Sequence, residues 1–383
     1  MPNLWSRLAG RSSTPAERKS GGQSLFAMTS LGDASWSRRS FPHLANEGFV
    51  KNPVVHRCVR LIAESATRVP LVAEEGGRRL SEHPLLKLLA LPNPRQAGGE
   101  LLEAVYAFLQ TAGNAYLEAA IVTGEVRGLY CLLPDRMRVV AGRDGWPRAY
   151  AYTAGGRTVE LSQESAPIPR VLHLALFHPL DDHYGLSPLE AAAQSLDIHN
   201  AAGRWNKALL DNAARPSGAL VYSGAANLTA DQFERLKGEL ERAFSGAVNA
   251  GRPMVLEGGL DWKGLSHSPR DMDFIELKHM AAREIALAFG VPPMLLGIPG
   301  DNTYANLQEA NRAFWRQTVI PLVRRVADDL SFWLAPAFGG VRLAADLDGV
   351  EALAEDRAAL WARVGAADFL SDEEKRKLVG VGS

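Results

Sequence analysis

The spacing of apolar residues predicts three helices in the first third of the chain. Over residues 53–70, apolar side chains recur every three or four positions between two prolines, which is the period of an amphipathic helix. The same pattern predicts helices over residues 84–91 and 99–112. The first of these two helices is expected to end at Pro92-Asn93-Pro94, and the second at Gly113-Asn114.

After residue 113 the period of the pattern changes. Short segments rich in β-branched and aromatic residues are separated by Gly or Pro, which is typical of strands joined by turns. These segments cover residues 116–122, 126–133, 137–141, 149–153, 158–161 and 171–176. Because the strands are gathered between helices and do not alternate with them, the sequence predicts an α+β fold for this first lobe.

Two long helices are predicted further along the chain. The first begins at Ser187-Pro188-Leu189-Glu190, with a capping Ser, a Pro at the first helical position and a Glu three residues after the cap, and continues to about residue 213. The second covers residues 271–289 and ends at Gly290. The segment between them predicts a strand at 218–222, a helix at 229–244 capped by Thr229, and a hairpin at 253–265. This plan is a two-helix stalk with a small α+β domain at its tip.

The remaining pattern predicts a loop and a kinked helix. The loop covers residues 297–302, and the helical pattern that follows runs over residues 304–334 and contains Pro321. Pro321 lacks the N–H that would bond to the Gln317 carbonyl, and its ring crowds that carbonyl, so a kink is expected there. Two charged helices, over residues 351–364 and 371–379, complete the chain.

Amino-acid composition limits the classes of function that the chain can have. The 383-residue chain is 46% hydrophobic and 22% charged, so it buries a substantial core. Its 42 Lys and Arg against 43 Asp and Glu leave a formal charge of -1, which argues against a protein that clamps DNA phosphates by bulk positive charge. Cys58 and Cys131 lack metal-ligand spacing and are expected to be buried thiols. The Arg- and Ser-rich first residues predict a flexible arm, with a transit peptide as the alternative.

The sequence lacks the common signatures of nucleotide-binding and hydrolytic enzymes. Absent are the phosphate-binding Gly-x-x-x-x-Gly-Lys-Ser/Thr loop, His-Glu-x-x-His, Cys-x-x-Cys and Gly-x-Ser-x-Gly. His173, His178 and His183 form the closest group of histidines, but their spacing gives no shared face, so polar packing is favoured over metal ligation. The pair Asp181-Asp182 is interpreted as a solvated turn, because adjacent side chains diverge.

Eight motifs follow one another along most of the chain. They are NPVVHRCVRLIAE at 52–64, HPLLKLL at 83–89, PNP at 92–94, GNAY at 113–116, GLSPL at 185–189, REIALAFGVPPMLLG at 283–297, YANL at 304–307 and IPL at 320–322. In this order and approximate spacing they resemble the portal family of tailed double-stranded-DNA bacteriophages, in the siphovirus-type branch that includes gene transfer agents.

The resemblance implies the α+β portal fold and its divisions. These are a flexible arm (1–45), a wing (46–186), a first stem helix (187–213), a clip (214–268), a second stem helix (269–290), a tunnel loop and tunnel helix counted with the wing (291–334), and a crown with the C-terminal tail (335–383). The crown is the segment with the weakest motifs.

The resemblance also implies a function without catalysis, cofactor or metal. The chain would form a ring, of twelve subunits, at the head–tail vertex of a virion or gene transfer agent particle assembled in the bacterial cytoplasm. Double-stranded DNA would pass through it without sequence specificity during packaging and ejection. Its partners would be terminase, the major capsid protein and the head–tail adaptor. No association with a membrane is expected. The alternatives are a non-viral oligomeric scaffold and a minor capsid enzyme.

Candidate DNA-channel residues follow from their positions on the second stem helix and the tunnel loop. They are Arg270, Lys278, Arg283, Asp301, Asn302, Thr303 and Tyr304. Mixed charge suits a conduit, because each added phosphate contact raises a salt-dependent barrier to sliding. Alternatively, the helix charges form i, i+4 pairs on a solvated face, and Asn302 or Thr303 caps the helix that begins at Tyr304. Candidates for adaptor docking on the clip are Arg235, Lys237 and Arg242.

Overall fold

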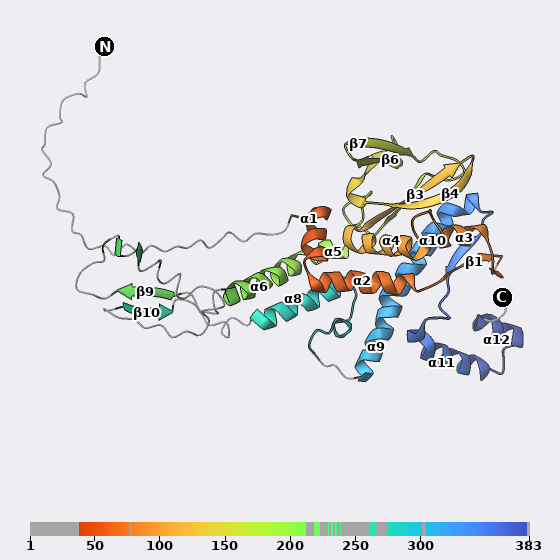
Figure 1. Cartoon of the computed structure of the whole chain (residues 1–383). Helices are drawn as coiled ribbons and strands as arrows, with labels where there is room; N and C mark the ends of the chain where they lie inside the picture. Colours follow the sequence, from red (N-terminus) through yellow and green to blue (C-terminus); the bar gives the residue numbers. More distant parts are fainter. Residues whose placement is uncertain are drawn as a thin grey trace, which may run out of the picture. The chain divides into compact units, whose positions relative to one another are not determined.

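The computed structural model describes residues 38–76, 78–211, 218–222, 229, 231–232, 234–235, 238, 260–264, 274–300 and 304–380. The chain divides into two units, Met1–Ser35 and Trp36–Ser383, and every described residue belongs to the second. Figure 1 shows the elements of this second unit.

The three helices predicted from apolar spacing are present. They are α2 (Pro53–Thr67), α3 (Pro84–Ala90) and α4 (Gly98–Ala112). Two helices that precede them, α1 (Phe41–Ala45) and the π-helix η1 (Asn46–Val50), were not predicted. The prediction of a flexible arm over residues 1–45 is therefore wrong for its last five residues. They form α1, and Leu44 is buried in the core.

All six predicted strands are confirmed, within one to two residues at their ends. They are β3 (Asn114–Val122), β4 (Glu125–Leu132), β5 (Met137–Ala141), β6 (Pro147–Ala154), β7 (Arg157–Ser162) and β8 (Val171–Ala175). They form two antiparallel sheets in the orders β4-β3-β8 and β5-β6-β7, and the short helix η2 (Pro134–Arg136) joins β4 to β5. A small core of Tyr and aliphatic residues contributed by both sheets packs them together. The α+β prediction is confirmed.

A third sheet joins distant parts of the chain. Its order is β11-β1-β2, from β1 (Leu71–Glu75), β2 (Arg78–Leu80) and β11 (Arg342–Ala345), and Leu71 lies opposite Ala345. None of these strands was predicted. The boundary placed at residue 335 for a crown needs correction, since β11 follows it and pairs with a strand of the predicted wing.

Helix α2 lies at the centre of the larger core. It packs against α4, against the second stem helix and against α10 (Ile320–Leu334), and its inner face is fully buried. Figure 1 shows α2 below α4, with α10 crossing both. The spacing of three and four residues between its apolar side chains is what places that face inward.

The predicted first stem helix is interrupted. Ser187 caps it as expected, since its Oγ accepts the Glu190 N–H at 3.0 Å. The chain then forms α5 (Pro188–Ala191), and Ala192, with φ -83° and ψ 1°, separates it from α6 (Ala193–Asp211). Helix α6 packs along α8 (Phe274–Ala288), the second stem helix (Figure 1).

The predicted kink at Pro321 takes the form of a π-helix. Helix α9 (Tyr304–Phe314) continues into η5 (Trp315–Val319) and then into α10. In a π-helix a carbonyl accepts from the residue five positions on, so the Gln317 carbonyl does not depend on the N–H that Pro321 lacks. The wider turn thus accommodates the proline without ending the helix.

The end of the chain is helical, as predicted. After η6 (Ala335–Ala337) and β11 come η7 (Glu351–Leu353), α11 (Ala354–Gly365) and α12 (Asp372–Leu378). The predicted cap of α12 is confirmed, because the Ser371 N–H donates to Glu374 Oε2 at 2.8 Å and the Glu374 N–H donates to Ser371 Oγ at 3.3 Å.

Part of the predicted clip is described. Strand β9 (Gly218–Tyr222) pairs with β10 (Leu260–Gly264), with Gly218 opposite Gly264. Thr229 and Gln232 form a reciprocal cap, which confirms the predicted helix start. The first arm of the predicted hairpin lies outside the described residues.

Candidate functional site

Asn52 joins α2 to α6. Its Oδ1 caps α2 by accepting the N–H groups of Val54 at 3.0 Å and Val55 at 3.1 Å. Its Nδ2 donates to Nδ1 of His199 at 2.9 Å and to Oδ1 of Asn200 at 2.8 Å, both on α6. One buried amide therefore caps α2 and holds α6 against it.

The stem helices carry a second set of polar contacts. Because the Asn52 amide nitrogen can only donate, His199 must accept through a neutral ring, and burial followed by the charge of Lys278 lowers the pKa of His199. Lys278, a predicted channel residue, lies half-buried on α8 within electrostatic reach of this histidine. Ser195 Oγ also donates to Glu284 Oε2 at 2.6 Å, which ties α6 to α8.

Two of the sequence motifs meet where the stem begins. Asn114 Oδ1 accepts the Gly185 N–H at 2.8 Å, and Asn114 Nδ2 donates to the Gly185 carbonyl at 3.2 Å. The backbones approach so closely that a Cβ on Gly185 would lie 2.1 Å from the Gly113 carbonyl oxygen. Gly113 itself has φ +70°, so neither position accommodates a side chain.

His173 belongs to the same junction. Its Nε2 donates to Asn114 Oδ1 at 2.9 Å, its ring stacks on Tyr116 with centroids 4.2 Å apart, and the edge of Tyr150 approaches at 5.6 Å. Burial lowers the pKa of His173 to about 4, from 6.5. The interpretation of this histidine as polar packing is confirmed.

Acid is expected to weaken the folded protein through His173. Below pH 6.5 the imidazole of His173 takes up a proton in the unfolded chain but not in the folded protein. The free energy of unfolding therefore falls as the pH drops from about 6.5 to about 4. The loss is on the order of 2 kcal/mol. Chemical unfolding from about pH 7 to about pH 4.5 measures it. His173→Phe keeps the aromatic stacking but has no titratable group. If the unfolding free energy of this variant changes with pH as much as that of the unaltered protein, His173 is not the cause of the acid sensitivity.

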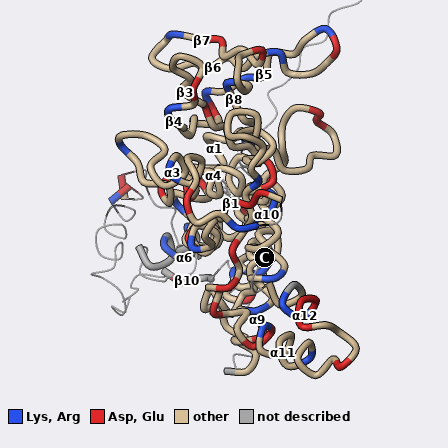
Figure 2. The backbone as a smooth tube through the Cα atoms, turned by 90° about the vertical axis from the view of Figure 1, so that its right-hand side faces the viewer, with Lys and Arg blue, Asp and Glu red and all other residues tan. Residues whose placement is uncertain are grey.

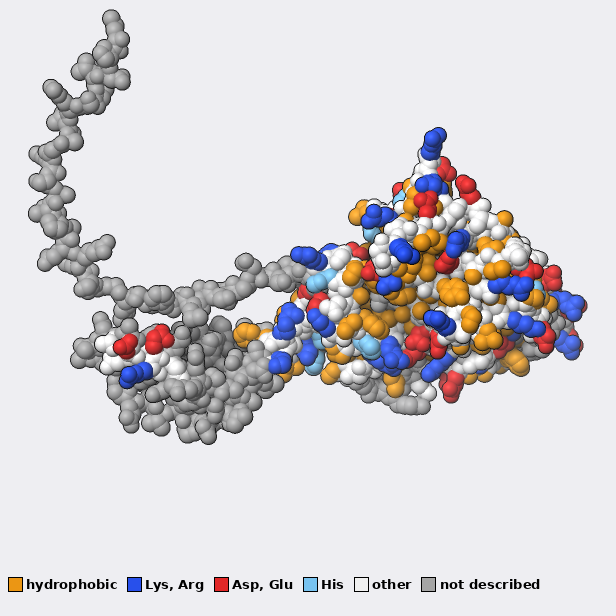
Figure 3. Space-filling view, turned by 45° about the horizontal axis from the view of Figure 1, so that its top comes forward, with side chains coloured by type: hydrophobic (Ala, Val, Ile, Leu, Met, Phe, Trp, Pro, Cys, Tyr) orange, Lys and Arg blue, Asp and Glu red, His pale blue; other side chains and the backbone are white. Residues whose placement is uncertain are grey.

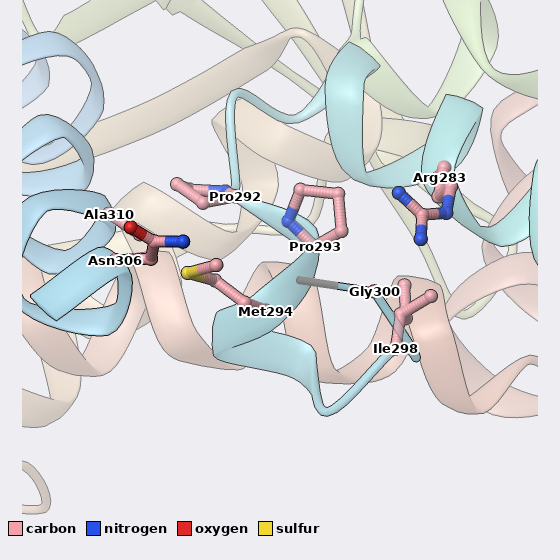
Figure 4. Close-up of a pocket in the computed structure, with 8 residues that line it drawn as sticks. All are labelled: Arg283, Pro292, Pro293, Met294, Ile298, Gly300, Asn306 and Ala310. Atoms are coloured by element: carbon pink, nitrogen blue, oxygen red, sulfur yellow. The ribbon is translucent and has the colours of Figure 1, made fainter. Parts of the chain in front are cut away.

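The chain after α8 folds back on that helix. Gly290 ends α8 with φ +65°, and the turn η4 (Pro293–Leu296) is closed by Gly297 at φ +71°. Ile298 is buried, and Arg283 Nη2 on α8 donates to the Pro299 carbonyl. A pocket of about 340 Å³ lies beside this contact, lined by Arg283, Pro292, Pro293, Met294, Ile298, Gly300, Asn306 and Ala310 (Figure 4).

The structure describes three of the seven predicted channel residues. Lys278 and Arg283 lie on α8, and Tyr304 is the first residue of α9. Arg283 is directed at its own chain, as Figure 4 shows. The remaining four, Arg270, Asp301, Asn302 and Thr303, lie outside the described residues. Of the clip candidates, Arg235 is helical and exposed, and Lys237 and Arg242 lie outside the described residues.

A cluster of ion pairs holds helix α11 against α9 and η5, which follow each other along the chain. Arg316 Nε donates to Asp356 Oδ2 at 3.0 Å, and its Nη2 lies 2.7 Å from Asp356 Oδ1. Arg312, which is mostly buried, pairs with Glu355, with Glu309 at 2.9 Å, and with Asp356 at 3.8 Å. We call these five side chains the clasp.

The π-helix η5, which carries Arg316 of the clasp and leads into α10, also contacts the end of α8. Thr318 Oγ1 donates to the Gly290 carbonyl at 2.6 Å, where α8 ends. A Cβ on Gly290 would lie 2.8 Å from that hydroxyl. The five residues Trp315–Val319 therefore connect the stem, the central helix α2 and the C-terminal helix α11.

Neither Asn52, Asn114 nor the clasp was predicted as functional. Asn52 precedes Pro53, and Asn followed by Pro at a helix start is a recognisable cap signal. Arg312 and Arg316 are spaced for one face of a helix, but nothing local identifies Asp356 as their partner.

Other kinds of site were sought in the described part of the chain. No group of three or more His, Cys, Asp or Glu side chains there could hold a metal ion. Cys58 is a buried free thiol, as expected, and Cys131 is a partly buried one; burial raises the pKa of each to about 12, which keeps both thiols protonated. Among the helices described, none is long and apolar enough to span a bilayer.

Comparison with known proteins gives the family. The model of the phage portal protein family matches residues 53–380. A chain in the neck of an empty gene transfer agent particle, computed with C6 symmetry, is 54% identical, with a TM-score of 0.73 over 92% of this chain and 96% of that chain. A chain in the neck of a native gene transfer agent particle, computed with C12 symmetry, is 52% identical, with a TM-score of 0.71 over the same shares. The portal protein of Enterobacteria phage HK97 is 27% identical over 97% of this chain and 88% of its own length. The chain belongs to the phage portal protein family.

Proposed function

We propose that this chain is a portal ring subunit at the head–tail vertex of a virion or gene transfer agent particle. In this role it forms the channel through which double-stranded DNA is packaged and ejected. The observation that carries the proposal is the similarity, over nine-tenths of the chain and at more than half of its positions, to chains in the necks of gene transfer agent particles. The C12 symmetry computed for one of those necks supports a ring of twelve subunits.

Exposed hydrophobic side chains support assembly with further copies. On α8, Met280 and Leu287 are seven residues apart and so lie two turns apart on one exposed face, where 79% of Leu287 is accessible. Before the stem, Phe177 and Leu180 are 80% and 90% accessible on a loop that Asn114 anchors at Gly185. Figure 3 shows hydrophobic side chains lying between charged ones on one face. In the proposed ring we expect neighbouring subunits to cover these side chains.

The charge distribution suits passage of DNA without retention. Lys and Arg are interspersed with Asp and Glu along the chain (Figure 2), and the formal charge is -1. Without a continuous basic surface, a channel makes few phosphate contacts and lets the duplex slide. In this proposal terminase and the head–tail adaptor dock in turn on the clip, which includes Arg235, Lys237 and Arg242, and the major capsid protein surrounds the ring. Packaging energy then comes from terminase, and this chain catalyses no reaction.

Electron microscopy of the purified full chain tests the proposal. We expect rings with a central hole, and twelve subunits in rings taken from assembled particles. The non-viral scaffold and the minor capsid enzyme both predict other shapes. A monodisperse monomer at the concentrations used for microscopy, or closed oligomers without a hole, would contradict the proposal.

A further inference from the structure

Helix α11 turns an uncharged side away from the rest of its chain. Three of its four charged residues contact the protein itself: Glu355 and Asp356 belong to the clasp, and Arg357 Nη1 donates to the Leu347 carbonyl at 2.7 Å. Of the residues of α11, Val364 alone is fully buried. One exposed stripe of the helix carries no charge, and we call it the outer face of α11. It consists of Ala354, Ala358, Trp361, Ala362 and Gly365.

The outer face follows the period of the helix. Its members at 354, 358, 361 and 365 are separated by four, three and four positions, so they lie above one another on one side. Arg363, the remaining charged residue, is two positions from Trp361 and therefore lies on another side. Trp361 is 54% accessible, and a Cβ on Gly365 would meet nothing within 4 Å. A surface helix that needs no partner directs its charges to water and its apolar side to the core, and α11 reverses much of that arrangement.

The segment around α11 buries little apolar surface within its own subunit. Phe369, between α11 and α12, is 86% accessible, and Leu378 on α12 is 55% accessible. Figure 1 shows α11 and α12 beside each other near the C-terminus. Helix α11 has 12 residues, a length at which a helix depends on packing for its stability. The clasp supplies polar contacts on one side, and the outer face is available for apolar packing on another.

We propose that the outer face of α11 packs against a second copy of this chain. The proposal rests on the function above, in which the chain forms a ring. The portal family model matches as far as residue 380, so α11 belongs to the part of the chain that the family shares. Chains similar to this one come from gene transfer agent necks computed with C6 and C12 symmetry. In a cyclic ring every subunit has an identical neighbour on each side, and each contact joins two different surfaces of the chain.

The chemistry of the outer face fits a protein surface and not DNA. It has no Lys or Arg, so it offers no ionic contact to a phosphate. Its alanines and Gly365 are small enough for a helix of the neighbouring copy to approach closely, and Trp361 supplies one large side chain that such a contact would bury. Because the clasp fixes the opposite contacts of α11 to α9 and η5, the outer face is presented in a defined direction.

Photo-crosslinking from position 361 tests the proposal in rings of the full chain. A photoreactive benzoyl-phenylalanine replaces Trp361, and rings are assembled from a mixture of unlabelled chains and chains labelled with heavy nitrogen. We expect crosslinked pairs in which one peptide is labelled and the other is not. The same replacement at Ala359, an exposed position on another side of α11, is the matched control and is expected to give about tenfold fewer such pairs. Crosslinks within single chains only, or none in intact rings, would overturn the proposal. In assembled particles, crosslinks to another particle protein in place of this chain would overturn it as well.

A charge on the outer face provides a second measurement. Trp361→Glu places a carboxylate in the apolar contact between copies, whereas in a separate subunit the same side chain stays in water. We expect an unchanged unfolding midpoint for the separate subunit and about a tenfold rise in the chain concentration at which half of the protein is assembled into rings. Ala359→Glu adds the same charge to another side of α11 and is expected to leave assembly unchanged.

The outcomes separate this contact from the proposed function. If the unaltered chain forms no rings, the proposed function itself fails. If the unaltered chain forms rings and Trp361→Glu assembles at the same concentration, the ring stands and the contact through the outer face of α11 is overturned.

Discussion

Gly185→Ala is expected to prevent the chain from forming a stable subunit. The new Cβ would lie 2.1 Å from the Gly113 carbonyl oxygen and 2.5 Å from the Leu176 backbone nitrogen, and neither atom belongs to a side chain that could rotate away. Separating the two segments would break the hydrogen bonds of Asn114 to Gly185 and of Leu176 to Gly113. The expected loss of unfolding free energy is about 3 kcal/mol or more, a large part of the stability of an ordinary domain.

The measurement is the yield of soluble protein and the midpoint of its chemical unfolding. Gly203→Ala is the matched control, because Gly203 lies within α6 and its Cβ would meet nothing within 4 Å. That substitution is expected to raise the unfolding free energy by about 0.5–1 kcal/mol, since alanine is the better helix former. A Gly185→Ala protein that unfolds at the normal midpoint would show that the close approach of the two backbones is not a requirement of the fold.

Reversal of one charge in the clasp is expected to release helix α11 from α9 and η5. Arg316→Glu replaces a two-bond ion pair with repulsion from Asp356, and Arg312 alone cannot neutralise three carboxylates. The pairs are partly exposed, so the expected cost is about 1–2 kcal/mol, equivalent to a 5- to 30-fold increase in local opening. Hydrogen exchange of the peptide covering residues 354–365 measures it.

A charge swap provides the control for the clasp. Combining Arg316→Glu with Asp356→Arg restores an attractive pair and is expected to return exchange most of the way to normal. Arg363→Glu, on an exposed position of the same helix, is expected to leave exchange of α11 unchanged. If the swap opens α11 as much as the single reversal, the ion pair with Asp356 is not what holds the helix. Because Arg316 belongs to the π-helix that Thr318 links to the stem, exchange in Trp315–Val319 should rise together with that of α11.

Only part of the candidate site could be predicted from the amino-acid sequence. Position along the chain placed Arg283 beside the loop, and its contact with Pro299 agrees with that location. Its direction toward its own backbone was not predictable, because a side chain's partner depends on how α8 and the loop meet. The clasp illustrates the same limit, since Arg312 and Asp356 lie on helices that were both predicted but whose faces are brought together only by the fold around them.

Elements that have a local cause could be predicted from the amino-acid sequence. Helix α2 follows from apolar residues spaced every three or four positions, β3 to β8 follow from short β-branched runs between turn residues, and the caps at Ser187 and Ser371 follow from side chains that bond to their own backbone. The third sheet, the break at Ala192 and the clasp depend instead on contacts between distant segments. Strand β1 lacks a strong pattern of its own, and it becomes a strand because β11, far along the chain, supplies hydrogen-bond partners once α10 has packed on the core. Local propensities cannot encode such pairings, because the free energy that stabilises them comes from contacts that exist only after the chain has closed.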